Sequence, residues 1–351
     1  MKKSYLMMAA AATMFAACTQ SDFVNEVPEE APQAIGFENY VGKSTRAEIN
    51  SEENLATEGG FVVWGYKTKT VDPVLWDGTN DIATIFDGVN VKGAKDNWTY
   101  DNKKYWDKTS SYNFYAVAPY QPESGTYSLL GENLSEKATN GYIKITGVKS
   151  APAATSDDFL LARGGQKNVS GDYTVTHDKV SLNFNHIMSK VTLALACGGI
   201  NAGDKITVTS LTMTGWNEND GVFTQSLDAT PTVTNNIEEW NIATPSIAGN
   251  AAFTGPYNLT PGGENAEVGS YIMVPQSVAK LTFTLDYTIT YKAGGTEDFV
   301  AHSGELTAQT WGTDTHTTYT ITVGPAPIEF EVNTVNGFTN SPTPQPGLSI
   351  Q

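Results

Sequence analysis

Apolar and polar residues alternate in many short runs along this chain, and most runs stop at turn-forming residues. Alternation with a period of two places successive side chains on opposite faces of a β-strand. A strand of this kind has one buried and one solvated face, and many of them in succession are typical of β-sandwiches. We therefore predict an all-β protein. The clearest predicted strands are residues 142–145, 180–184, 190–193, 281–285 and 319–323.

The chain divides into two halves of similar length. A polar, glycine-bearing stretch at 163–172 is followed by a strong strand pattern that begins at Val180. We place a domain boundary near residue 178, which gives an N-terminal domain at 47–178 and a C-terminal domain at 179–326. A length of 351 residues is ample for two separate cores. A short helix is predicted at 51–56, with Ser51 as its N-cap.

An alternating segment also precedes the first domain. Residues 34–41 alternate so that Ile35, Phe37 and Val41 fall on one face of a strand. The polar stretch 42–47 follows and suits an exposed loop. We therefore predict one further strand before the first domain, with an accessible connection behind it.

A similar pattern follows the second domain. Ile328, Phe330 and Val332 alternate with acidic residues, and Val335 and Phe338 come next. The chain then ends in a proline-bearing segment, for which we predict no regular structure. The whole segment 327–351 is thus one more strand with a loose tail.

The first residues read as an export signal. Lys2 and Lys3 precede a short apolar run that ends in small residues before Cys18, and the run is shorter than the about 20 residues of a membrane-spanning helix. The order Ala-Ala-Cys resembles the lipobox of bacterial lipoproteins, in which the cysteine is acylated and becomes the mature N-terminus. We assign 1–17 to a lipoprotein signal peptide and 18–33 to a flexible tether. The alternative is an ordinary cleaved signal with an accidental cysteine.

Charge and cysteine content narrow the choice of partners. The formal net charge is −17, which argues against nucleic acid as a partner and leaves the lipid as the membrane contact. If Cys18 carries lipid, Cys197 has no disulfide partner, so the core must stabilise the fold by itself. Cys197 closes an apolar run and is expected to be a small buried hydrophobe.

The sequence contains few candidates for catalytic, cofactor-binding or metal-binding residues. The four histidines lie far apart without zinc-ligand spacing, and the sequence contains neither a glycine-rich phosphate loop nor a nucleophile elbow. Residues 217–221 could be taken for a calcium loop, but they lack its ladder of Asp residues, so we predict a hairpin turn. We expect no enzyme activity, no cofactor and no metal. An aromatic cluster could stack on sugars, although core packing is the more usual role; its members are Trp98, Tyr100, Tyr105 and Trp106.

Several motifs, taken together and in order, resemble the fimbrillin (Mfa-like) family over nearly the whole mature chain. The segment 180–191 is similar to the opening of that family's second domain, and the lipobox agrees with the family's export route. The other motifs are Trp98-x-Tyr100, Tyr105-Trp106, residues 114–120, Val274-Pro275-Gln276 and Trp311-Gly312 followed by His316 and Tyr319.

The resemblance implies the architecture of a type V pilin, with two transthyretin-like β-sandwich domains in a lipoprotein precursor. In that family an arginine-specific protease removes an N-terminal segment that contains the first strand, and a strand from a neighbouring subunit fills the groove. Here the removable segment would be 34–46, with Arg46 as the cleavage site and Ala47 as the new N-terminus. Lys43 is a competing basic residue.

The resemblance also implies a donor strand, and segment 327–351 lies where one is expected. Its inward residues would be Ile328, Phe330, Val332, Val335 and Phe338. The alternative is that both end strands simply complete their own domains.

We interpret the chain as a structural subunit of a surface fimbria, anchored as a precursor to the outer membrane by lipid. The implied partners are other fimbrillin subunits and an arginine-specific protease. A first alternative is a tip or accessory subunit, or a surface lipoprotein adhesin that binds glycans, a host protein or a bacterial surface ligand. A second alternative is an exported hydrolase on a β-sandwich, which the missing catalytic constellation disfavours.

Overall fold

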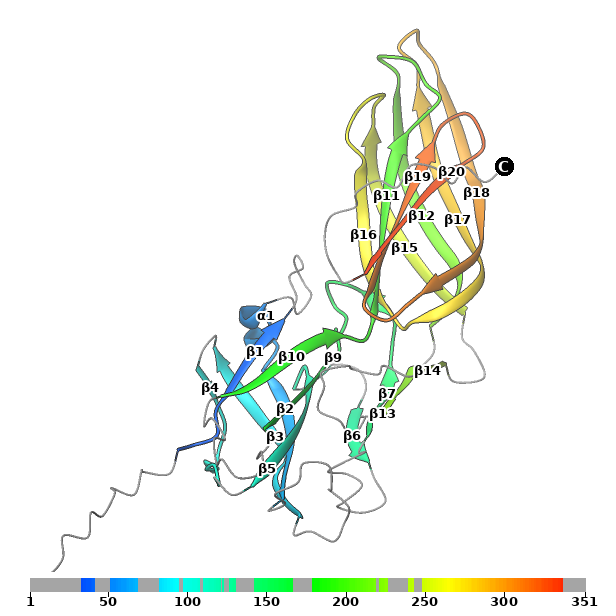
Figure 1. Cartoon of the computed structure of the whole chain (residues 1–351). Helices are drawn as coiled ribbons and strands as arrows, with labels where there is room; N and C mark the ends of the chain where they lie inside the picture. Colours follow the sequence, from blue (N-terminus) through cyan, green and yellow to red (C-terminus); the bar gives the residue numbers. More distant parts are fainter. Residues whose placement is uncertain are drawn as a thin grey trace, which may run out of the picture. The chain divides into compact units, whose positions relative to one another are not determined.

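Strands dominate the computed structural model of the chain (Figure 1). Among the described residues, no helix has the length and hydropathy needed to cross a membrane. The model describes residues 33–41, 51–68, 82–94, 97–107, 110–120, 122, 126–130, 142–166, 179–218, 221–226, 239–242 and 248–336.

The first sandwich combines a seven-stranded sheet, in the order β1-β10-β9-β5-β2-β3-β4, with a four-stranded sheet, in the order β14-β13-β7-β6. The strands of the larger sheet are β1 (Phe37–Val41), β2 (Phe61–Thr68), β3 (Ile82–Ala94), β4 (Asn97–Thr99), β5 (Ser111–Ala118), β9 (Leu160–Gln166) and β10 (Val180–His186). Those of the smaller sheet are β6 (Thr126–Leu130), β7 (Tyr142–Val148), β13 (Gly221–Ser226) and β14 (Glu239–Ile242).

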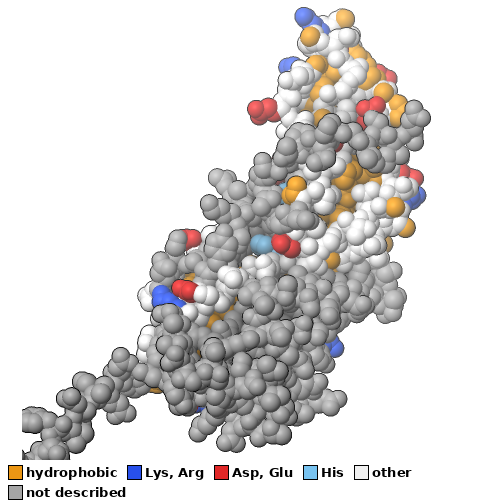
Figure 2. All heavy atoms as spheres, in the orientation of Figure 1, with side chains coloured by type: hydrophobic (Ala, Val, Ile, Leu, Met, Phe, Trp, Pro, Cys, Tyr) orange, Lys and Arg blue, Asp and Glu red, His pale blue; other side chains and the backbone are white. Residues whose placement is uncertain are grey.

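The second sandwich pairs a five-stranded sheet, in the order β20-β19-β11-β16-β8, with a four-stranded sheet, in the order β15-β12-β17-β18. The first of these sheets contains β8 (Ala151–Pro152), β11 (Ser189–Cys197), β16 (Ala266–Met273), β19 (Thr315–Val323) and β20 (Glu329–Asn336). The second contains β12 (Lys205–Asn217), β15 (Ala248–Leu259), β17 (Gln276–Thr290) and β18 (Thr296–Trp311). On the face drawn in Figure 2, several hydrophobic side chains (orange) are exposed over this sandwich.

The alternation in the sequence predicted strands correctly. All five of the clearest predicted strands lie inside β7, β10, β11, β17 and β19. The predicted helix is also present as α1 (Glu52–Thr57), because the hydroxyl of Ser51 accepts a hydrogen bond from the Asn54 amide at 3.1 Å and caps its first turn. The fold is all-β, as predicted.

The first sandwich buries both faces of its larger sheet. Phe61 and Val63 of β2 belong to one cluster of buried side chains, and Val62 and Trp64 belong to another that includes Ile145 of β7. Since neither face of β2 meets water, its residues are apolar in succession and do not alternate. In the second sandwich a single cluster fills the space between the two sheets.

Pairing between distant strands differs from the division predicted at residue 178. The strand at 180–186 was predicted to open the second domain, but β10 pairs with β1 and β9 of the first sandwich. Conversely, β8 pairs with β16, and β13 pairs with β7. The reason is that alternation reveals which face of a strand is buried, whereas the hydrogen-bonding partner depends on residues far away in the sequence.

The hairpin predicted at 217–221 is not formed by the described strands on either side of it, because they do not pair with each other. β12 ends at Asn217 and pairs with β15 and β17, whereas β13 begins at Gly221 and pairs with β7 and β14. The turn residues therefore connect strands of different sheets. Turn-forming residues indicate that the chain changes direction, but they do not specify that the strands on either side pair with each other.

Candidate functional site

The first strand lies at the edge of the larger sheet of the first sandwich. β1 runs parallel to β10, with Phe37 opposite Val180, and β10 is the only strand next to it in the described part of that sheet. The Val180 amide donates to the Gly36 carbonyl at 2.8 Å. β1 therefore forms a strand ladder with β10 alone among the described strands.

A second segment holds the beginning of this strand from the other side. The Ile35 amide donates to the Lys104 carbonyl at 2.8 Å, and the Trp106 amide donates to the Gln33 carbonyl at 3.0 Å. The hydroxyl of Tyr100 donates to the Ile35 carbonyl at 2.7 Å. Residues 33–37 thus lie in a slot with backbone hydrogen bonds on both sides.

The floor of this slot is aromatic. Ile35 and Phe37 are each 1% exposed. The ring of Phe37 meets four other rings edge to face, with centroid distances of 5.5 to 6.0 Å. These four rings belong to Phe61, Phe86, Tyr100 and Phe114. Loss of the first strand would therefore uncover a preformed apolar socket.

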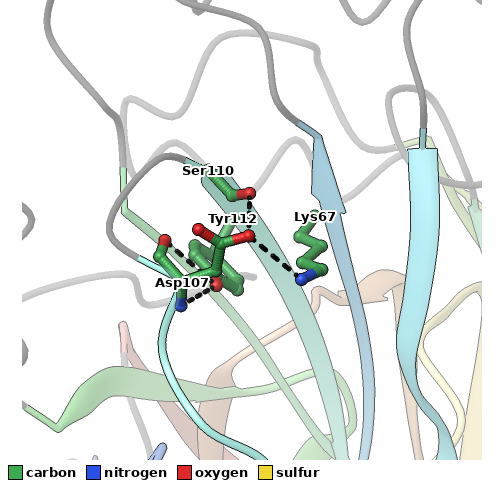
Figure 3. A network of polar contacts seen from close by, with 4 residues as sticks. All are labelled: Lys67, Asp107, Ser110 and Tyr112. Carbon is green, nitrogen blue, oxygen red and sulfur yellow. Dashed lines mark hydrogen bonds and ion pairs between the residues drawn. The ribbon is translucent and has the colours of Figure 1, made fainter. Parts of the chain in front are cut away.

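The far wall of the slot is fixed by a polar network (Figure 3). Asp107 accepts hydrogen bonds from Ser110 at 3.0 Å and from the ammonium group of Lys67 at 3.3 Å. The amide of Asp107 donates to the hydroxyl of Tyr112 at 2.6 Å. Burial raises the pKa of Tyr112 to about 12, so this phenol stays protonated at neutral pH. The segment that holds the first strand is thereby tied to β2 and β5.

The last described strand lies at the edge of the second sandwich. β20 pairs antiparallel with β19, with Phe330 opposite Ile321 and Val332 opposite Tyr319. The ring of Phe330 packs against Phe283 at a centroid distance of 5.1 Å. This strand therefore packs within its own sandwich in this state of the chain.

The seat of β20 is shallow. Ile328, Phe330 and Val335 are only partly buried, and Val332 is 41% exposed. The ring tip of Phe330 sits directly over Gly304 of β18, where an added Cβ would come within 2.7 Å of the ring. The contrast with the fully buried residues of β1 indicates that β20 is held more weakly.

Several predicted site residues lie outside the described residues. These are the lipidation site Cys18, the cleavage pair Arg46 and Ala47, the competing Lys43 and the tail residue Phe338. Of Val41 only the backbone is described, as the last residue of β1. The assignments of these residues remain predictions.

The predicted aromatic cluster belongs mostly to the core. Trp98, Tyr100 and Trp106 are no more than 6% exposed, and Tyr105 is 53% exposed. Core packing is therefore the correct interpretation for three of the four rings. Cys197 is partly buried, and burial raises the pKa of its thiol, which disfavours the reactive thiolate. No cluster of three potential metal ligands occurs among the described residues.

Sequence reasoning missed the groups that line the slot opposite β10. Lys104 and Trp106 bind residues 33–35 through backbone groups, and a sequence carries no local signal for that role, whereas core packing of the Trp106 ring was expected. The sequence also carries no local signal for the Ser181 hydroxyl, which hydrogen-bonds the Glu38 carboxylate, or for Gly304 beneath Phe330.

These features define an all-β protein of two sandwiches, with an edge strand at each end of its described chain. The chain belongs to the Fimbrillin-like family, whose sequence pattern matches residues 45–339. A comparison with curated proteins finds no match.

Several solved structures are similar to this chain, and among the following three one has a TM-score above 0.5. A fimbrial protein from Bacteroides vulgatus has a TM-score of 0.62 and 18% sequence identity, with 87% of this chain and 99% of that chain covered. Putative cell adhesion proteins from Bacteroides ovatus and Bacteroides uniformis have TM-scores of 0.47 and 0.42, with 13% and 14% identity. Their coverage is 89% of this chain and 100% of that chain for the first, and 87% and 98% for the second. At 18% identity the likeness to the Bacteroides vulgatus protein concerns the fold alone.

Proposed function

We propose that this chain is a structural subunit of a bacterial surface fimbria, exported as a lipoprotein and acylated at Cys18. An arginine-specific protease cuts after Arg46, and the processed subunits polymerise by strand exchange. Membership of the Fimbrillin-like family and the fold shared with a fimbrial protein support this proposal. The role is structural and requires no catalytic group.

One observation carries the proposal: the first strand is an edge strand that nevertheless supplies core side chains. Burial of Ile35 and Phe37 contributes about 1.5–3 kcal/mol each, or roughly 3–6 kcal/mol together. That is a large share of a domain's net stability of about 5–15 kcal/mol. A sandwich that has lost residues up to 46 would expose an apolar socket and the unpaired edge of β10. Another chain's strand can satisfy both needs at once.

Head-to-tail donation explains why the product is a filament. A donor strand at one end of a subunit and an acceptor groove at the other form a heterologous contact that does not close on itself. β20 is the candidate donor, because it is a weakly seated edge strand followed by a short tail. Its residues Ile328, Phe330, Val332 and Val335 would enter the neighbouring groove, with Phe338 beyond them.

Proteolysis of the purified precursor tests the maturation step. We expect an arginine-specific protease to give a product that begins at Ala47 and assembles into filaments visible by electron microscopy. Arg46→Gln should stay intact and monomeric, whereas the matched control Lys43→Gln should be cut and assemble like the wild type. Cleavage of the wild type at Arg46 without assembly would contradict strand exchange, and filaments from uncut Arg46→Gln would contradict the maturation step.

Fractionation of cells tests the anchor. The small residues before Cys18 predict that Cys18→Ala abolishes acylation and removes the precursor from the outer-membrane fraction. The control is Cys197→Ala, which should leave membrane partition unchanged. Unchanged partition of Cys18→Ala, with no acyl mass on the N-terminal peptide of the wild type, would contradict lipid anchoring.

A further inference from the structure

The first and last strands of the described chain carry the same short sequence. Residues 35–38 read Ile-Gly-Phe-Glu, and residues 328–331 read Ile-Glu-Phe-Glu. Each segment leads into a strand at a sheet edge, and in both the Ile and the Phe belong to or pack against a core cluster. The last strand thus shares the motif Ile-x-Phe-Glu with the strand that maturation would remove.

Superposing one motif on the other fixes a register. Ile328 takes the place of Ile35, Phe330 the place of Phe37 opposite Val180, and Glu331 the place of Glu38 opposite Ser181. Glu38 accepts a hydrogen bond from the Ser181 hydroxyl, and Glu331 has the same carboxylate to offer. The Phe ring then enters the socket that four aromatic rings already form around Phe37.

Within this four-residue motif the two segments differ at one position. Gly36 of the first strand corresponds to Glu329, and a side chain at position 36 would lie against Lys179, whose Cγ is 3.2 Å from an ideal Cβ. Lys179 is exposed, and its ammonium group is opposite in charge to the carboxylate that Glu329 would bring beside it. The incoming strand therefore brings opposite charge to a position where the original strand has no side chain.

In the groove beside β10, the side chains of β20 would also bury more apolar surface than they do beside β19. Val332 is 41% exposed beside β19. In the new register it lies opposite Leu182, which is fully buried in the core of the first sandwich. Phe330 would move from a partly buried seat to one in which Phe37 is 1% exposed. Additional apolar burial at about 25 cal/mol per Å² favours the exchange.

We propose that the groove accepts β20 of a second copy of this same chain, parallel to β10 and in the register Ile328 for Ile35. This inference rests on the proposed function and deepens it, since it names the partner and its alignment. Ser181 and Lys179 then become residues that select the donor, and the chain forms a polymer without help from another subunit type.

Paired cysteines test the register in the full chain, with Cys197→Ala as the background. The variant with Ser181→Cys and Glu331→Cys, cut by the arginine-specific protease and oxidised, should give a ladder of covalent oligomers on non-reducing gels. Reduction should collapse the ladder to one band. The matched control, Ser181→Cys with Glu329→Cys, shifts the pair by two residues and should give at least tenfold less cross-linked product.

The outcomes separate this inference from the function on which it depends. Filaments that cross-link through Glu329→Cys, or through neither pair, overturn the register while strand exchange stands. A purified chain that is cut at Arg46 but forms filaments only after a different subunit is added overturns the second copy as partner. A cut chain that forms no filament under either condition overturns strand exchange itself, and this inference with it.

Discussion

Phe37 and Phe330 are the same residue type in the same local motif, and they differ in what surrounds them. Phe37 touches four aromatic rings and is 1% exposed. Phe330 touches Phe283 and covers a glycine, and it is only partly buried. Phe37 should therefore contribute more than Phe330 to the free energy of unfolding of the precursor.

Replacement of Phe37 measures how much its burial among the four aromatic rings contributes to the stability of the precursor. Phe37→Ala should lower the free energy of unfolding of the precursor by about 3–5 kcal/mol, because it leaves a cavity among rigid rings. Urea denaturation followed by circular dichroism measures the change. Tyr105→Ala, at a neighbouring ring that is 53% exposed, is the control and should change the value by no more than about 0.5 kcal/mol. A loss below about 1 kcal/mol for Phe37→Ala would show that the socket collapses around the smaller side chain.

The two end strands differ in their hydrogen bonding and in the burial of their side chains. The segment 33–41, which ends in β1, has backbone hydrogen-bond partners on both sides of residues 33–36 and supplies the buried side chains of Ile35 and Phe37. β20 pairs with β19 alone and has no fully buried side chain among residues 329–335. The strand that we propose is removed is thus firmly held, and the strand that we propose as the donor is held more weakly.

Gly304 allows the seat of β20 to be weakened without any change in β20. Gly304→Ala places a methyl group about where the Phe330 ring tip now lies, at 2.7 Å, and overpacking of this kind costs about 1–3 kcal/mol. We expect faster hydrogen exchange of the β20 amides and faster assembly after cleavage. Thr307→Ala, at an exposed position of the same strand β18, is the control and should leave both rates unchanged. Slower exchange in Gly304→Ala would contradict a seat that depends on this glycine.

The whole molecule is held together by aromatic burial and strand pairing across its length. β8 and the β13-β14 pair each hydrogen-bond to a strand from the other half of the sequence. Tyrosines are buried in both sandwiches, and burial raises the pKa of Tyr66 and of Tyr319 to about 12. In the unfolded chain these phenols have an ordinary pKa of 10.0.

Alkaline pH should therefore lower the free energy of unfolding of the protein. Below about pH 9 the phenols are protonated in both states, and stability does not depend on them. Between the unfolded pKa of 10.0 and the folded pKa of about 12, the unfolded chain binds fewer protons, so the free energy of unfolding falls as pH rises. Urea midpoints at pH 8, 10 and 11 should decline in that order, and Tyr66→Phe should decline less than the wild type. Equal declines in the two proteins would contradict a contribution from Tyr66.

The sequence by itself determined the features that depend on neighbouring residues. Alternation identified the strands, the capping side chain of Ser51 identified the helix, and the set of motifs identified the family. The inward face of β1, with Ile35 and Phe37, also followed from alternation. Each of these properties arises from side-chain periodicity or from hydrogen bonds within one turn, so a local stretch of sequence contains the information.

Only the tertiary structure decided which strands pair. Nothing near Val180 indicates that β10 joins β1 and β9, and nothing near Gly221 indicates that β13 joins β7. The wall of the slot at Lys104 and Trp106, and the seat of Phe330 over Gly304, were likewise invisible in the sequence. The physical reason is that backbone groups are the same in every residue, so the choice among partners is made by the packing of the complete core.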